Sequence, residues 1–223
     1  MKYSDSCIYL LFFVSMIAKN KIMNKYLFFL SIIILTISGC GEKTSLSPLP
    51  NDSAILAFGD SLTYGYNVAK NESYPAKLST LTGLEVINAG VSGEVSNQGL
   101  KRLPKILDEH RPQLIILCHG GNDLLHKLDI GEMESNLRNM IQLSLDRDIP
   151  VILLGVPKPG LFLSSFDIYK EIAISMDVIF IEDLIPDILS DKSLKSDTVH
   201  PNKEGYSLIA EEIYSLLLDT GAI

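Results

Sequence analysis

The sequence contains no tryptophan, and it is poor in cysteine and histidine. Only three cysteines occur among 223 residues, and because Cys7 and Cys40 lie near the N-terminus, Cys118 stands alone in the rest of the chain. A disulfide within the body of the protein and a cysteine-rich zinc site are therefore both excluded. The histidines do not suggest a metal site either, because His110 and His126 lack partners at metal-ligand spacing.

Basic residues are outnumbered as well. The chain carries 19 lysines and arginines against 27 aspartates and glutamates, which gives a formal net charge of −8. An acidic surface repels phosphate backbones, so the composition argues against a nucleic-acid partner. The length suits one compact domain and is short for two, and no repeat or low-complexity tract interrupts the sequence.

No hydrophobic run is long enough to span a bilayer. Residues 8–18 and 27–37 are apolar, but each run has about 11 residues against the ~20 that a membrane-spanning helix needs. This length is typical of a signal peptide, and we predict that residues 1–39 are one. Met23 would be a compact alternative start, which would make residues 1–22 an over-extended gene start. An uncleaved hydrophobic anchor is the other interpretation.

The second apolar run ends in Ile-Ser-Gly-Cys at 37–40, which resembles the lipobox of bacterial lipoproteins. The resemblance implies cleavage before Cys40 and acylation of its sulfur, which would hold the protein durably on a membrane of the bacterial cell envelope, facing the periplasm or the exterior. Gly41 is not an aspartate-type retention signal, which favours the outer membrane in a cell with two membranes. Residues 40–52 predict the lipidated cysteine and a short tether, and residues 53–223 predict the folded domain.

From residue 53 onward, short apolar runs alternate with segments of helical spacing. Such runs, bounded by turn residues, are typical of buried strands. Five strands that alternate with helices predict an α/β fold, a three-layer sandwich in which helices cover both faces of a parallel sheet. The expected strands are 54–58, 85–89, 114–118, 151–154 and 178–181. The expected helices are 73–81, 96–107, 132–145, 165–176 and 203–218, the last with Asn202 as its N-cap.

Glycine-rich polar motifs follow the first three of these strands, at the carboxyl ends where parallel sheets form their sites. Gly-Asp-Ser-Leu occupies 59–62, Asn-Ala-Gly-Val-Ser-Gly-Glu occupies 88–94 and Gly-Gly-Asn-Asp occupies 120–123, while Asp-Thr-Val-His lies at 197–200. Each motif alone is weak, because such residues are common in turns. As an ordered set they resemble the SGNH (GDSL) hydrolase family over nearly all of residues 54–218. The first two motifs look nearest the small bacterial thioesterases, lysophospholipases and arylesterases.

The resemblance implies a flavodoxin-like five-stranded sheet and a serine esterase that needs no metal or organic cofactor. It assigns Ser61 as the nucleophile, His200 as its base and Asp197 as the residue that orients the imidazole. These residue types suit the reaction, because a serine hydroxyl needs a base that works near neutral pH. The implied oxyanion donors are the backbone N–H groups of Ser61 and Gly93 and the side-chain amide of Asn122.

The expected substrates are short- to medium-chain acyl esters, aryl esters, lysophospholipids or acyl thioesters, and a monomer suffices for this chemistry. Two alternatives remain open: a carbohydrate acetyl-esterase, disfavoured by the lack of tryptophan, and a non-catalytic envelope lipoprotein that binds lipids or glycans. Residues 155–162 either line an acyl pocket or form a simple Pro/Gly loop. We expect Asp60 to be structural, Cys118 to be an inert core thiol, and His119 to pack in the core or rim or to contact substrate.

Overall fold

The computed structural model describes residues 45–158 and 164–223. The expected signal peptide at 1–39 and the expected lipidation site, Cys40, lie outside the described residues, as do residues 159–163. Within the described part of the chain, no helix has both the length and the apolar character needed to cross a bilayer.

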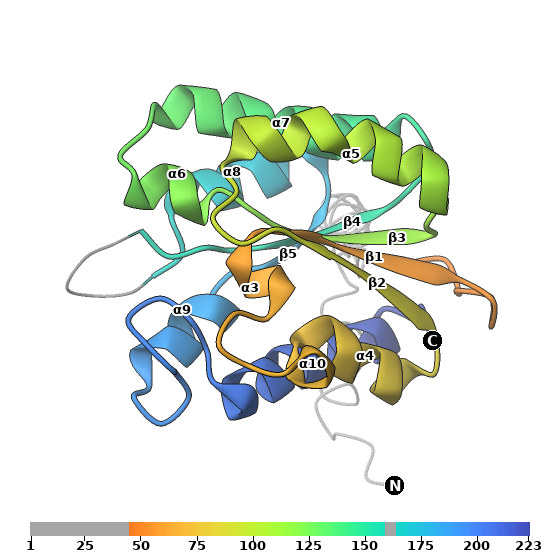
Figure 1. The fold of residues 1–223 in the computed structure, drawn as a ribbon. Coiled ribbons are helices and arrows are strands. Elements are labelled where there is room, and N and C mark those ends of the chain that lie inside the picture. Colours follow the sequence, from red (N-terminus) through yellow and green to blue (C-terminus); the bar gives the residue numbers. More distant parts are fainter. Residues whose placement is uncertain (1–44, 159–163) are drawn as a thin grey trace, which may run out of the picture. The chain divides into compact units, whose positions relative to one another are not determined.

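A five-stranded parallel sheet forms the centre of the domain (Figure 1). Its strands lie in the order β2-β1-β3-β4-β5, and each neighbouring pair is parallel. This order confirms the expected α/β class and the flavodoxin-like topology. The strands are β1 (Ala54–Gly59), β2 (Glu85–Gly90), β3 (Leu114–Cys118), β4 (Val151–Leu154) and β5 (Ile179–Ile181).

Helices cover both faces of the sheet, which makes the domain the expected three-layer sandwich. In Figure 1, α5 and α7 lie side by side on one face, and α4 and α10 lie side by side on the other. The helices are α3 (Ser61–Tyr64), α4 (Tyr74–Thr82), α5 (Ser96–His110), α6 (Gly121–Leu125), α7 (Ile130–Leu145), α8 (Asp167–Met176), α9 (Leu184–Ser190) and α10 (Lys203–Asp219), with a 3-10 turn η1 at Lys70–Glu72.

The five long helices occur where the hydrophobic spacing predicts them, with ends that differ by a few residues. Helix α10 begins after Asn202, whose side-chain oxygen accepts a hydrogen bond from the Gly205 N–H at 3.0 Å. Helix α5 continues past Pro104 to His110, beyond the expected end at residue 107. The sequence did not predict α3, α6, α9 or η1, because elements this short hold too few residues to reveal a period.

The hydrophobic core lies on both sides of the central strands. All residues of β1, β3 and β4 are buried, as expected for strands covered on both faces. Large tyrosines from the helices complete the core, and their hydroxyl groups contact the site-bearing segments at its edge. Tyr169 Oη donates a hydrogen bond to the His119 carbonyl at 2.7 Å, and Tyr74 Oη lies 3.2 Å from Thr63 Oγ1. These tyrosines therefore hold the segments that follow β3 and β1.

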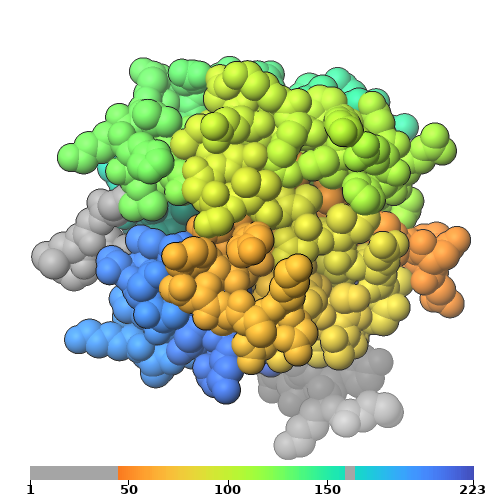
Figure 2. Space-filling view, viewed as in Figure 1, coloured from red at the N-terminus to blue at the C-terminus, as the bar shows by residue number. Residues whose placement is uncertain are grey.

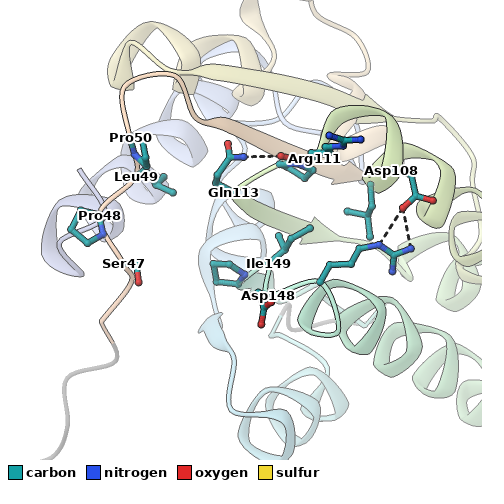
Figure 3. A pocket seen from close by; sticks show the side chains of 13 residues that line it. Ser47, Pro48, Leu49, Pro50, Asp108, Arg111, Gln113, Asp148 and Ile149 are labelled. Carbon is teal, nitrogen blue, oxygen red and sulfur yellow. Dashed lines mark hydrogen bonds and ion pairs between the residues drawn. The ribbon is translucent and has the colours of Figure 1, made fainter.

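The segment 45–50 packs at the edge of the sheet where the strands begin (Figure 3). The Leu46 N–H donates to the Thr220 carbonyl at 3.2 Å, and the Leu49 N–H donates to the Ala222 carbonyl at 2.7 Å. Part of this segment forms one wall of a cavity of about 720 Å³, whose other walls include the turns that precede β3 and β4. No residue of the glycine-rich motifs lines this cavity, because the motifs follow the carboxyl ends of the strands and the cavity lies where the strands begin.

Candidate active site

Ser61 is the first residue of helix α3 and lies at the carboxyl end of β1. Asp60 caps this helix, because its Oδ1 accepts a hydrogen bond from the Leu62 N–H at 3.0 Å. Burial raises the pKa of the Asp60 carboxyl above its ordinary value. The backbone of Tyr64 occupies the space that a side chain at Gly90 would fill, so α3 packs directly on β2. These contacts fix Ser61 where the strand order switches direction, the usual place for a site in this fold.

Ser61, His200 and Asp197 form a continuous chain of hydrogen bonds. His200 Nε2 lies 2.9 Å from Ser61 Oγ. The two residues are far apart in the sequence, but Figure 2 shows the orange segment that contains α3 next to blue segments from the C-terminal part of the chain. His200 Nδ1 lies 2.8 Å from Asp197 Oδ2. A carboxylate can only accept, so Nδ1 carries the hydrogen and Nε2 is left to accept the Ser61 hydroxyl proton. A serine nucleophile requires this arrangement.

Asp197 receives hydrogen bonds on both carboxylate oxygens. Its Oδ1 accepts from the N–H groups of Val199 at 2.8 Å and His200 at 2.9 Å. Its Oδ2 accepts from Asn67 Nδ2 at 2.9 Å, in addition to the imidazole. Burial by itself would raise the pKa of Asp197, but the hydrogen bonds from Val199 and His200 outweigh it and hold the pKa below its ordinary value. Asp197 is therefore ionised and can stabilise a charged imidazole.

The sequence did not predict that Tyr66 and Asn67 contact these residues. The Tyr66 ring lies against His200, with 4.5 Å between the ring centroids. Asn67 adopts the left-handed conformation with φ of 66°, which asparagine tolerates better than most residues, and it also donates to Ser196 Oγ at 3.2 Å. The only local signal was an asparagine close to Gly65, in a stretch that suits a turn.

Gly93 and Asn122 line the same pocket as Ser61. The Glu94 N–H donates to the Val91 carbonyl at 3.2 Å and closes a turn in which Gly93 has φ of 80°, a conformation that favours glycine. The Gly93 N–H takes no part in that turn bond and has no acceptor among residues 45–158 and 164–223, so it can donate to a ligand. Asn122 Nδ2 donates to the Glu94 carbonyl at 2.9 Å and lies 3.3 Å from Asp60 Oδ2. The structure thus places Gly93 and Asn122, two of the three expected oxyanion residues, in the same pocket as the third, Ser61.

The pocket has a volume of about 470 Å³ and opens at the carboxyl edge of the sheet. It combines the polar groups described above with aliphatic side chains, a lining that suits a small apolar ligand. Val156 and Pro157 belong to that lining, so the start of the segment 155–162 faces the pocket, while residues 159–162 lie outside the described residues. The lining also contains the apolar side chains of Leu62, Leu125, Leu189 and Val199.

The remaining candidate residues lie away from the pocket. Cys118 is fully buried, and burial raises the pKa of its thiol well above the ordinary value, as expected of an inert core cysteine. His119 is also fully buried and bonds to Glu94 and not to the pocket. His110 and His126 are exposed. Within residues 45–158 and 164–223, no group of three or more His, Cys, Asp or Glu side chains is placed to hold a metal ion.

Comparison with known proteins supplies independent information. Residues 57–208 match the sequence model of the GDSL-like Lipase/Acylhydrolase family. "Thioesterase 1/protease 1/lysophospholipase L1" of Escherichia coli (strain K12) is 28% identical over 200 residues, which cover 86% of this chain and 91% of that protein. The arylesterase of Vibrio mimicus is 31% identical over 168 residues, which cover 70% of this chain and 84% of that protein.

Solved structures agree with this picture. The psychrotrophic esterase EstA from Pseudoalteromonas sp., in a structure inhibited by monoethylphosphonate, superimposes with a TM-score of 0.67 at 25% sequence identity. The superposition covers 74% of this chain and 96% of that one.

Proposed function

The chain belongs to the GDSL-like lipase/acylhydrolase family and is a serine esterase. We propose that it hydrolyses short- to medium-chain acyl esters through an acyl-enzyme on Ser61. The observation that carries the proposal is the 2.9 Å contact between Ser61 Oγ and His200 Nε2. It joins a hydroxyl group to a base whose other nitrogen is already bonded to Asp197.

In the first half-reaction, Ser61 Oγ attacks the ester carbonyl carbon and its proton moves to His200 Nε2. The positive imidazole is stabilised by Asp197. The tetrahedral intermediate collapses, the bond to the leaving alcohol breaks, and His200 returns the proton to that alcohol. In the second half, His200 takes a proton from water, which attacks the acyl-enzyme, and the acid leaves as Ser61 recovers its proton.

The charge that develops on the carbonyl oxygen needs hydrogen-bond donors. The proposed donors are the N–H groups of Ser61 and Gly93 and the Asn122 amide. One Asn122 hydrogen is used by the Glu94 carbonyl, and the other, in a longer contact with Asp60, is free to turn to an oxyanion. The left-handed backbone at Gly93 supports its assignment, because the turn leaves its N–H unused.

The pocket supports acyl esters as the substrate class, including aryl esters, lysophospholipids and acyl thioesters. Its aliphatic lining matches a hydrocarbon chain, and a volume of about 470 Å³ suits one acyl chain of short or medium length. An acetylated carbohydrate would find few aromatic surfaces for its ring, since Tyr66 is the one Phe, Tyr or Trp residue among the described residues of this lining. We therefore rank the carbohydrate acetyl-esterase second.

We also propose that the enzyme is a monomeric lipoprotein of the cell envelope, anchored through Cys40. The Ile-Ser-Gly-Cys sequence at 37–40 supports this, together with the short apolar run that precedes it. Mass spectrometry of the native protein tests the anchor, because acylation adds a defined mass to a chain that begins at Cys40. An uncleaved chain with an unmodified cysteine would refute it.

The catalytic proposal is tested with p-nitrophenyl esters from acetate to palmitate. We expect Ser61→Ala and His200→Ala to lower kcat by several orders of magnitude. Ser190→Ala is the matched control, because Ser190 is exposed on α9 and does not line the pocket, and it should leave kcat unchanged. A phosphonate probe should attach to Ser61, as peptide mass mapping would show.

The ester and phosphonate assays distinguish the esterase from its two alternatives. Activity of Ser61→Ala near that of the unmodified protein would end the proposal. An optimum at acetate, with turnover of acetylated glycans, would favour the carbohydrate esterase. A folded protein that neither turns over any ester nor reacts with the phosphonate would be a binding lipoprotein.

A further inference from the structure

A buried ionic cluster lies behind the oxyanion pocket, and the reaction described above does not use it. It consists of Glu94, Arg102 from helix α5, and His119 from the end of β3. Arg102 Nε and Nη2 each lie 2.7 Å from a different oxygen of the Glu94 carboxylate, and His119 Nε2 lies 3.1 Å from Glu94 Oε2. The side chain of Glu94 is 6% exposed and that of His119 is fully buried.

A buried charge is costly unless it is paired, and both oxygens of the Glu94 carboxylate are paired here, whereas the Arg102 side chain is 23% exposed. Burial by itself would raise the pKa of Glu94, but hydrogen bonds from His119 and Arg102 outweigh it and hold the pKa below its ordinary value. His119 Nδ1 accepts from the Gly120 N–H at 2.9 Å, so Nε2 carries the hydrogen that points to Glu94. A side chain at Gly99 would collide with His119, so helix α5 leaves room for the cluster.

The cluster touches each of the three segments that supply oxyanion donors. Arg102 Nη2 also donates to the carbonyls of Ala89 at 2.8 Å and Gly59 at 3.2 Å, which lie at the ends of β2 and β1. Gly59 is two residues before Ser61. Arg102 therefore ties the nucleophile segment to the loop that carries Gly93.

Glu94 makes the second connection. It directly follows Gly93, and its carbonyl accepts the Asn122 amide at 2.9 Å, while its carboxylate holds His119, three residues before Asn122. One residue thus bonds both the side chain of Asn122 and the segment that precedes it.

We propose that Glu94, Arg102 and His119 are positioning residues that hold the oxyanion donors of Ser61, Gly93 and Asn122 in place for ester hydrolysis. The inference rests on the proposed function of the same pocket. The three side chains do not touch the substrate; they act through the backbone at Gly93 and the amide of Asn122. Because these donors matter most when the oxyanion forms, disturbing the cluster should lower kcat more than it raises KM.

The main test is Glu94→Gln, which keeps the shape of the side chain but turns one acceptor into a donor facing Arg102 or His119. We expect kcat for p-nitrophenyl butyrate to fall by roughly 10- to 100-fold, below the ~10²–10³ typical of losing a whole donor, with KM changed by less than about threefold. Glu134→Gln is the matched control. Glu134 pairs with Arg138 Nε at 2.8 Å on helix α7, outside the pocket lining, and its loss should leave kcat unchanged.

A double-mutant cycle separates positioning from general damage to the fold. If Glu94 acts partly through Asn122, the loss caused by Glu94→Gln should be at least about threefold smaller in an Asn122→Ala background. Active sites are counted with a phosphonate probe, so that kcat refers to folded enzyme. Arg102→Lys is the second variant if Glu94→Gln fails to fold, because one ammonium keeps the charge but cannot reach Glu94 and both carbonyls together.

Equal losses in both backgrounds, a loss confined to KM, or no loss at all in either variant would overturn the inference. The proposed function fails separately, through Ser61→Ala. An inactive Ser61→Ala together with a fully active Glu94→Gln would leave the esterase mechanism intact and remove only the positioning role.

Discussion

Replacing Asn67 by glycine tests how much one hydrogen bond to Asp197 contributes to catalysis. Asn67 Nδ2 lies 2.9 Å from Asp197 Oδ2, the same oxygen that receives the imidazole hydrogen. Asn67 has φ of 66°, and glycine accepts this backbone conformation without strain. The substitution therefore removes the amide and leaves the turn in place.

The size of the effect follows from burial. A hydrogen bond to a charged group contributes about 1.5–3 kcal/mol when water is excluded. The Asp197 side chain is 39% exposed, so water replaces part of the lost bond. We expect a loss of about 0.5–1.5 kcal/mol, which is a fall in kcat/KM of about 2- to 12-fold.

The assay is kcat/KM on p-nitrophenyl butyrate, together with Tm by thermal unfolding. Asn67→Ala should lose the same activity as Asn67→Gly, but its Tm should be lower, because alanine is strained at positive φ and glycine is not. Full activity of Asn67→Gly would contradict this prediction, since it would show that Asp197 orients His200 without Asn67.

Three further predictions concern residues around the same pocket. The pKa of Glu94 is lowered in the folded protein, so its ionised form stabilises the fold above its unfolded pKa of about 4.3, and this contribution disappears as pH falls through the folded pKa. The Tm difference between the unmodified protein and Glu94→Gln should accordingly be present at pH 7 and shrink below about pH 4; a difference that stays constant would contradict this. Gly93→Ala and Gly83→Ala should lose similar stability, because both glycines have positive φ and no neighbouring atom would meet the added methyl group. Only Gly93→Ala should also lower kcat, by about tenfold. Equal kcat in the two variants would remove Gly93 from the oxyanion site. Tyr66→Ala should lower kcat/KM by about 2- to 12-fold through loss of ring packing worth about 0.5–1.5 kcal/mol against His200, while Tyr66→Phe keeps the ring and should retain activity.

Most of the architecture was predictable from local patterns. The β3 and β4 runs are uniformly apolar, and their bounds in the structure equal the predicted ones. The glycine-rich motifs after β1, β2 and β3 were assigned to the carboxyl edge because parallel strands end there together. Ser61, Gly93 and Asn122 meet in one pocket for that reason.

The contacts that support these residues were not predictable from the sequence alone. Asp197 and His200 lie on an irregular segment, and only the family resemblance linked them to Ser61. The bond from Asn67 to Asp197 joins positions 130 apart, and the bond from Arg102 to Gly59 joins positions 43 apart. Such pairs depend on how helices and loops pack on the sheet, and no local period or turn signal reports that packing.

The hydrogen bonds from Leu46 to Thr220 and from Leu49 to Ala222 have a practical consequence. They bring the segments 45–50 and 220–222 together at the edge of the sheet remote from Ser61. A fusion partner or an immobilising linker added to either segment would therefore be attached far from Ser61 and would leave the mouth of the pocket open. An immobilised esterase made in this way should keep its turnover, whereas attachment through Leu125 or Tyr66 should block substrate entry.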